Sequence, residues 1–131
     1  LRNEPRDITA EGWRWQAEQI IKVVRQITPK HTLIIGFHDW NSRQALISSK
    51  PFAADNIIYT FHYYDPFVFT HQGATWAGEG LPDVKDVSFP WTNKLNVPAS
   101  AKGKWVENLI NNYKEDSKAE KMFVDLKTAK D

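Results

Sequence analysis

Two short polar clusters carry the groups with which this sequence could do acid–base chemistry. The first is Asn3-Glu4-Pro5, near the amino terminus, and the second is His62-Tyr63-Tyr64, much further along the chain. Each cluster falls where an extended segment gives way to a loop. A carboxyl group at a strand end, with an amide beside it and a His/Tyr pair on a later strand, suits protonation of the oxygen between two sugar rings. The residues therefore predict one half of a sugar-cleaving active site.

Glu4 is the candidate general acid and base of this site. Partial burial at a strand end favours the protonated form of a carboxyl group near neutral pH. Asn3, its neighbour, could donate a hydrogen bond to a sugar hydroxyl. The competing interpretation is a solvated glutamate with a loop amide beside it, because such tripeptides also arise by accident.

Alternation along a strand groups the other candidates in pairs. His62 and Tyr64 are two positions apart, so on a strand both side chains point to one side, where they could order a carboxylate and a sugar. By the same rule His38 and Trp40 share a face and line the cleft beside them. The alternative for the first pair is a buried His and Tyr with polar partners in the core.

Aromatic residues are abundant in the segments expected to be loops. Flat aromatic faces fit the apolar faces of pyranose rings, and we expect Trp40 and Trp76 to be exposed platforms of this kind. Trp13, Trp15 and Trp105 fall on expected helices and are interpreted as packing residues. A metal site lacks tight ligand spacing and is disfavoured; its candidate ligands would be His38, Asp39, His62, Asp65 and His71.

The apolar pattern predicts alternating strands and helices around these residues. Residues 1–4 are the tail of a strand, Thr9 caps a helix that Pro29 ends, and residues 31–37 and 56–62 are strands buried on both faces. A short helix is expected within 41–49 and a long loop over 64–101. A broken helix then follows, and its second part begins at a capping box of Ser117 and Glu120.

This order predicts an α/β fold with parallel strands joined by right-handed crossovers. The pattern alone leaves a barrel and an open sheet undecided. Polar and aromatic residues gather at the carboxyl ends of the strands, which is the active face in both architectures. No strand is followed by the glycine-rich turn of a nucleotide-binding sheet.

Length, charge and composition set the outer limits. The chain has 131 residues, enough for one domain or a piece of one, and its abrupt ends suggest a fragment. Its 17 basic and 16 acidic residues give a net charge of +1, which favours a neutral ligand over nucleic acid. It has no cysteine, no apolar run long enough for a membrane span, and no motif that requires a cofactor.

The combination of motifs resembles glycoside hydrolase family 5, the retaining β-glycanases that include many endo-acting cellulases. The resemblance rests on Asn3-Glu4-Pro5, on the segment from Trp13, Trp15, Gln16 and Ile20 to residues 31–36, and on residues 61–67 and 69–76. It covers essentially the whole chain but only the middle of the family's (β/α)8 TIM barrel. Residues 1–131 would form an incomplete barrel, from the end of strand four through the helix after strand six.

The resemblance implies a role for each candidate. Glu4 resembles the family's acid/base, Asn3 the amide that contacts the sugar 2-hydroxyl, and His62 and Tyr64 the strand-six pair around the catalytic carboxylates. The family's nucleophilic glutamate lies on strand seven, outside this chain, as do its strand-two arginine, strand-three histidine and strand-eight tryptophan. The implied reaction is double displacement on internal β-1,4 bonds of a cellulose-like β-glucan, without a cofactor, by a secreted or periplasmic enzyme.

Three alternatives stay open on the sequence. One is a noncatalytic carbohydrate-binding domain that uses the same aromatic loops, and another is a mannan- or xyloglucan-active member of the same family. The third is an open-sheet enzyme or scaffold in which Glu4 is incidental. By itself the chain has one carboxylate of the catalytic pair, so we expect no meaningful turnover from it. We also expect it to need the rest of the barrel, or a partner, for stability.

Overall fold

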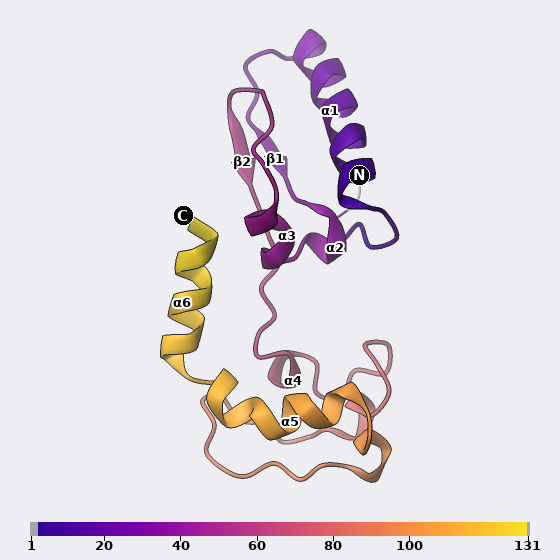
Figure 1. Ribbon diagram of the computed structural model, residues 1–131, viewed down its shortest axis with the longest axis vertical. Coiled ribbons are helices and arrows are strands. Elements are labelled where there is room, and N and C mark those ends of the chain that lie inside the picture. The colour runs from indigo at the N-terminus through magenta and orange to yellow at the C-terminus, as the bar shows by residue number, and fades with distance from the viewer. Residues whose placement is uncertain (1–2, 131) are drawn as a thin grey trace. The chain divides into compact units, whose positions relative to one another are not determined.

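The structure is a computed structural model that describes residues 3–130, and it divides into two compact units (Figure 1). The amino-terminal unit is Leu1–Tyr63 and the carboxy-terminal unit is Tyr64–Asp131. In the described part of the chain, no helix is both long and apolar enough to cross a bilayer. Each unit has a hydrophobic core of its own.

Helix α1 (Ala10–Ile27) begins and ends where the sequence predicts. The Thr9 side chain accepts a hydrogen bond from the Gly12 N–H, which satisfies one of the free donors of the first turn. Ala17 and Ile21 are the buried residues of its inner face. Trp15, predicted to be a packing residue, is 64% exposed because it lies on the opposite face of this amphipathic helix.

The sheet of the amino-terminal unit consists of β1 (Leu33–Ile35) and β2 (Ile57–Tyr59), paired in parallel with Leu33 opposite Ile57. The α/β class with parallel strands is therefore confirmed. Both strands are shorter than predicted. The chain between them forms α2 (His38–Asn41) and α3 (Arg43–Ser48), which confirms the expected short helix. Of the predicted strand tail over residues 1–4, Asn3 and Glu4 form a bend, and residues 1 and 2 lie outside the described part.

Only one face of this sheet is covered. Leu33, Ile35 and Ile57 pack against the core beneath α1, whereas Ile34 is 70% exposed and its register partner Ile58 is 54% exposed. The prediction of strands buried on both faces is thus wrong for this chain. In the described part of the unit, two strands and the helices on one side leave the opposite apolar face without a second layer.

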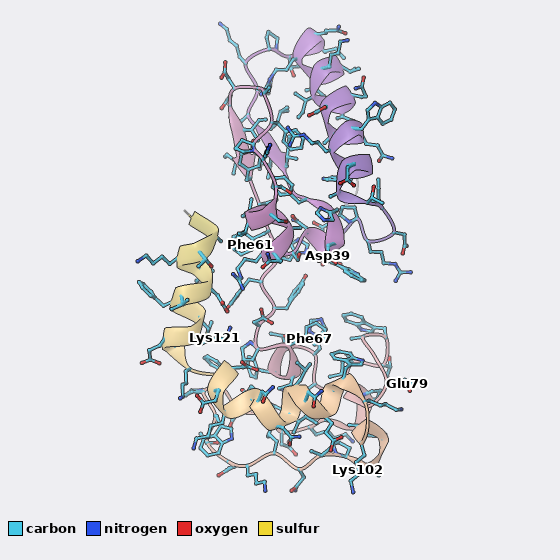
Figure 2. The ribbon with its side chains drawn as sticks, viewed as in Figure 1. Asp39, Phe61, Phe67, Glu79, Lys102 and Lys121 are labelled. Carbon is cyan, nitrogen blue, oxygen red and sulfur yellow. The ribbon has the colours of Figure 1, made fainter. Side chains whose placement is uncertain are left out.

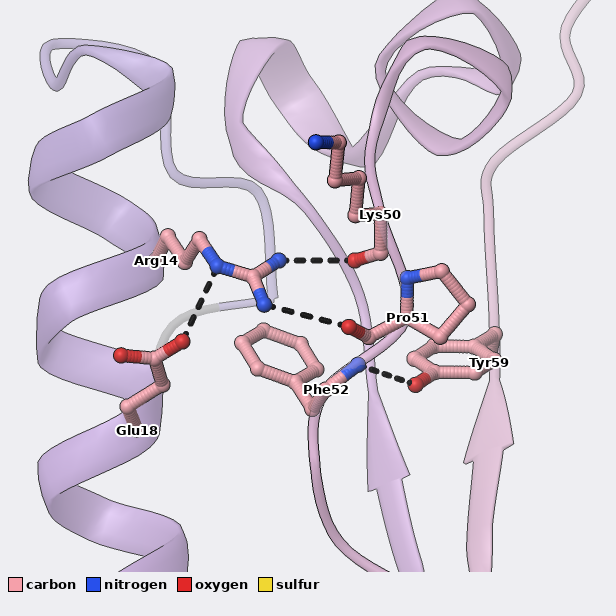
Figure 3. Close-up of polar contacts among 6 residues, drawn as sticks. All are labelled: Arg14, Glu18, Lys50, Pro51, Phe52 and Tyr59. Carbon is pink, nitrogen blue, oxygen red and sulfur yellow. Dashed lines mark hydrogen bonds and ion pairs between the residues drawn. The ribbon is translucent and has the colours of Figure 1, made fainter.

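Arg14 joins α1 to the segment that leads into β2 (Figure 3). Its guanidinium donates to the carbonyls of Lys50 and Pro51 at 2.7 and 3.1 Å, and its Nε pairs with Glu18 at 2.9 Å. The same guanidinium lies 5.0 Å from the ring centre of Phe52. The phenol oxygen of Tyr59, in β2, accepts a hydrogen bond from the Phe52 N–H. These contacts hold residues 50–52, in the segment between β1 and β2, against α1 and β2.

The carboxy-terminal unit has no strand in its described residues. Its core gathers around α5 (Trp105–Asp116), whose Val106, Ile110 and Tyr113 are buried against the short helices α4 (Phe67–Thr70), η1 (Leu81–Asp83) and η2 (Ala99–Ala101). The Tyr113 hydroxyl donates to the Ser88 carbonyl at 2.6 Å. The long segment predicted to be a loop is therefore ordered by packing on α5, although it is mostly irregular.

The second part of the predicted broken helix is α6 (Ala119–Lys130). The predicted capping box is wrong, because Ser117 is the C-cap of α5. Its hydroxyl accepts from the Trp91 N–H and donates to the Lys114 carbonyl, both at 3.3 Å. The main-chain carbonyl of Lys118 starts α6 instead. Trp105 is 48% exposed and only partly fits the prediction of a packing residue, since its ring is tilted against that of Phe67 with the ring centres 5.8 Å apart.

Candidate active site

Glu4 and His62, 58 residues apart, are brought together at one end of the amino-terminal unit. The His62 Nδ1 lies 2.6 Å from the Glu4 Oε1, a short hydrogen bond that becomes an ion pair when the imidazole is protonated. The two side chains are 20% and 37% exposed, respectively. This pair is partly screened from water and open on one side, as a group that exchanges protons with a ligand must be.

The backbone of His62 is held by the chain that follows β1. Its N–H donates to the Asn41 carbonyl at 2.7 Å, and it forms an isolated parallel bridge with Ser42. Ser42 in turn caps α3 through the Ala45 N–H and donates to the Asp39 carboxylate at 3.0 Å. His62 is thus fixed by main-chain contacts beyond the end of β2.

The segment that carries Glu4 is held by the same turn. Pro5 is fully buried, and its carbonyl accepts a hydrogen bond from the Trp40 N–H at 3.2 Å. One turn therefore supports both members of the pair. Figure 2 shows where this turn lies: Asp39 in α2 and Phe61, just after β2, are at the same end of the unit.

The prediction that the two candidate pairs lie on strands is wrong. His62 and Tyr64 follow β2 rather than lie on it, so strand alternation does not orient them. His38 and Trp40 lie in α2, a turn with left-handed backbone at Asp39 and Trp40, and not on a strand. His38 is partly buried there, Trp40 is 52% exposed, and Asn3 is exposed near Glu4 in sequence.

Tyr64 and Trp76 belong to the carboxy-terminal unit, where both contact a buried histidine. The ring of His71, 8% exposed, stacks on Phe67 at 3.7 Å and meets Tyr64 and Trp76 edge to face at 5.2 and 5.3 Å. Tyr64 is 42% and Trp76 78% exposed. Figure 2 marks this cluster by the label of Phe67. The predicted exposure of Trp40 and Trp76 is confirmed.

Sequence reasoning gave no role to two residues that organise these sites. The sequence places Asn41 only at the start of the expected short helix within 41–49, and His71 only among the candidate metal ligands. The signal for Asn41 is Gly36, where a side chain would overlap that of Asn41. No local pattern marks His71, because its ring contacts depend on how the irregular segment folds. In residues 3–130, no three His, Asp or Glu side chains are grouped to hold a metal ion.

Comparison with known proteins gives a consistent result. Residues 1–124 match the family Cellulase (glycosyl hydrolase family 5). Endoglucanase 3 of Fibrobacter succinogenes is 35% identical over 130 residues, which are 90% of this chain and 20% of that protein. Endoglucanase C of Acetivibrio thermocellus is 32% identical over 90 residues, or 69% of this chain and 26% of the relative.

Solved structures agree with the sequence comparison. The endoglucanase Cel5A of Thermotoga maritima is 38% identical and superposes with a TM-score of 0.60, over 91% of this chain and 36% of that one. The same enzyme has been solved in complex with mannotriose, with a TM-score of 0.58 to this chain. The chain thus spans about a fifth to a third of the length of these proteins. The match over nearly all of its residues shows that this chain belongs to glycosyl hydrolase family 5, the cellulase family.

Proposed function

We propose that this chain is part of the catalytic domain of a retaining glycoside hydrolase that cleaves internal β-1,4 bonds of cellulose-like β-glucans. The observation that carries the proposal is the hydrogen bond between Glu4 and His62, at the end of the sheet where the carboxyl termini of β1 and β2 lie. The names of the relatives, which are endoglucanases, support the substrate class.

In this proposal Glu4 is the general acid and base. His62 orients its carboxyl group, and the proton on that group passes to the glycosidic oxygen as the bond to the anomeric carbon breaks. A second carboxylate, about 5 Å away and outside this chain, bonds to the anomeric carbon. Glu4, now ionised, then takes a proton from a water molecule whose oxygen bonds to the anomeric carbon as the bond to the second carboxylate breaks, which leaves Glu4 protonated and the second group a carboxylate again.

The other candidates bind the glycan in this proposal. Asn3 contacts the 2-hydroxyl in the reacting subsite, and Tyr64 serves as the tyrosine of the family's strand-six pair. His38 and Trp40 line the cleft, and Trp76 offers its exposed face to a pyranose ring. The chain as a whole would be the stretch from the end of strand four through the helix after strand six of a (β/α)8 barrel. By its resemblance to the family, the enzyme would be secreted or periplasmic.

A mannan-active enzyme of the same family is the second candidate. It is favoured by one finding, that a structure similar to this chain has been solved with mannotriose bound. Parallel assays on soluble glucan and mannan decide between the two, since the proposed chemistry is the same and only the sugar contacts differ.

The test uses the complete catalytic domain that carries these residues. Glu4→Gln should lower kcat on a soluble β-glucan by about 10²- to 10⁴-fold, the usual contribution of a general acid. The same variant should lose much less kcat/KM on an aryl glycoside whose leaving group needs no proton, because this ratio does not include the later step in which Glu4 acts as base. Glu11→Gln, an exposed glutamate in the first turn of α1, is the matched control and should retain full activity.

Two outcomes would overturn the proposal. Undiminished cleavage of the polymer by Glu4→Gln removes Glu4 from the chemistry. Products released with inverted anomeric configuration, seen by proton NMR in the first minutes of reaction, exclude double displacement.

A further inference from the structure

The turn between β1 and α3 has an unusual backbone. Asp39, Trp40 and Asn41 have φ values of 52, 55 and 58°, so that left-handed conformation continues through successive residues without a glycine. Such conformations are disfavoured for bulky side chains such as that of Trp40. They persist only where surrounding contacts fix them, and they concentrate at functional sites.

The side chain of Asn41 makes a buried contact that holds this turn. Asn41 is 2% exposed, and its Oδ1 accepts a hydrogen bond from the Phe37 N–H at 2.9 Å. A β-carbon on Gly36 would occupy the same space as that side chain, so the absence of one at Gly36 makes room for it. Asparagine is also among the residues that tolerate left-handed backbone best.

Two residues of this turn contact the segments that carry the proposed acid–base pair. The Asn41 carbonyl accepts from the His62 N–H at 2.7 Å, and the Trp40 N–H donates to the carbonyl of Pro5, the residue after Glu4. All these residues belong to the amino-terminal unit. Main-chain contacts of one turn therefore set the distance between the segment of Glu4 and the segment of His62.

We propose that Asn41 is a positioning residue, which holds Glu4 and His62 in hydrogen-bonding register by locking the left-handed turn over residues 39–41. The inference rests on the proposed function, because the pair it positions is the proposed acid–base pair. It assigns to a buried amide, without contact to the reacting atoms, the task of keeping the carboxyl group oriented.

The first readout is the His62 ring, observed by NMR in the catalytic domain that carries this chain. The Glu4 Oε1 can accept a hydrogen bond from His62 whether the acid proton is on the other carboxyl oxygen or absent, and the proton shared by the two residues is then on the Nδ1 of His62. We expect a resolved Nδ1–H resonance in the unaltered protein and its loss in Asn41→Ala. Asn56→Ala is the matched control, because Asn56 has the same left-handed backbone, with φ 56°, at the opposite end of β2. It should keep the resonance.

The second readout is the rate. Asn41→Ala should lower kcat by about 10- to 100-fold with little change in KM, since misplacement of a reacting group by about 1 Å has such effects. In a His62→Ala background the same substitution should cost less than about twofold, because residues that act as a unit are not additive. Asn41→Gly keeps the left-handed backbone and serves if Asn41→Ala does not fold; it too should lose the resonance and rate, to a smaller extent.

The results separate this inference from the proposed function. An Nδ1–H resonance that survives in Asn41→Ala and Asn41→Gly overturns the positioning role, whatever the activity. Its loss in Asn56→Ala as well also overturns the role, since it would report general loosening. The role is also overturned if Asn41→Ala lowers kcat as much in the His62→Ala background as it does in the unaltered protein. By contrast, an active Glu4→Gln rejects the proposed function alone and leaves the NMR result to decide on Asn41.

Discussion

Glu4 and His62 share a hydrogen bond of 2.6 Å between two segments that have no strand pairing with each other in the described structure. The turn over residues 39–41 binds the main chain at Pro5, next to Glu4, and at His62. The two candidates are thus positioned by loops at the end of the sheet and not by the strands themselves. Functional residues on loops, supported by a rigid scaffold, are the usual arrangement in α/β folds.

Gly36→Ala tests whether the turn has room for change. A β-carbon at this position would overlap the buried Asn41 side chain, so we expect a loss of about 1–3 kcal/mol in the free energy of unfolding, the usual cost of overpacking. Urea denaturation measures it. Gly12→Ala, inside α1, is the control, where better helix propensity offsets mild crowding by Ile8 and Thr9. Equal stability of both variants would contradict the steric argument.

Trp40→Ala tests the exposed aromatic face beside the proposed site. If Trp40 stacks on a sugar, its loss should weaken binding of a cello-oligosaccharide by about tenfold, which corresponds to about 1.4 kcal/mol. Trp15→Ala is the control, because Trp15 is exposed to a similar extent but lies on the outer face of α1. Titration calorimetry on the complete catalytic domain measures both. Similar affinity in the two variants would remove Trp40 from the binding surface.

The sequence predicted those parts of the fold that local chemistry determines. The cap at Thr9 and the buried face with Ala17 and Ile21 follow from residue types and helical spacing alone. The parallel pairing of the strands follows from the crossover between them. These features need no knowledge of distant contacts, and the structure confirms them.

The features that were missed depend on distant contacts. Ile34 has the residue type of a buried strand, yet its exposure is decided by which layers are present on its face of the sheet. Ser117 has the pattern of a capping box but bonds to Trp91 instead. The left-handed turn that ends at Asn41 contains no glycine from which it could be predicted. It is stabilised by a buried side-chain contact rather than by the backbone preference of its residues.

Arg14→Lys tests the contact between α1 and the crossover. A lysine keeps the charge but cannot donate to two carbonyls at once in the planar geometry of a guanidinium, and it loses the flat contact with Phe52. We expect a loss of about 1–2 kcal/mol in unfolding free energy. Arg6→Lys, whose pair with Asp7 is exposed, should change stability by less than about 0.5 kcal/mol. A neutral Arg14→Lys would show that the contacts contribute nothing net.

Two neighbouring acids at the end of α5 should respond to pH in opposite directions. Burial raises the pKa of Asp116, with the charges of Asp65 and Asp125 acting in the same direction and that of Lys121 against it. The hydrogen bond and charge of Lys118 lower the pKa of Glu115. A carboxyl group with a raised pKa weakens the fold once it ionises, and one with a lowered pKa strengthens it.

The direction of each pH effect depends on whether the folded or the unfolded chain binds the proton more tightly. Folded Asp116 binds its proton more tightly than the unfolded chain does, so its contribution to stability falls as the pH rises through its ordinary value and then through its raised pKa. Asp116→Asn should therefore unfold at higher urea concentration than the unaltered protein at pH 7 and at the same concentration near pH 2.

Glu115→Gln, the matched control, should show the reverse at pH 7. In the unaltered protein the Glu115 carboxylate contributes stability above its ordinary pKa, and that contribution disappears as the pH falls through the lowered pKa of the folded state. The variant should thus be slightly less stable at pH 7, by a small amount because the pair with Lys118 is exposed, and equal near pH 2. Parallel pH profiles for the two variants would show that burial does not distinguish these adjacent side chains.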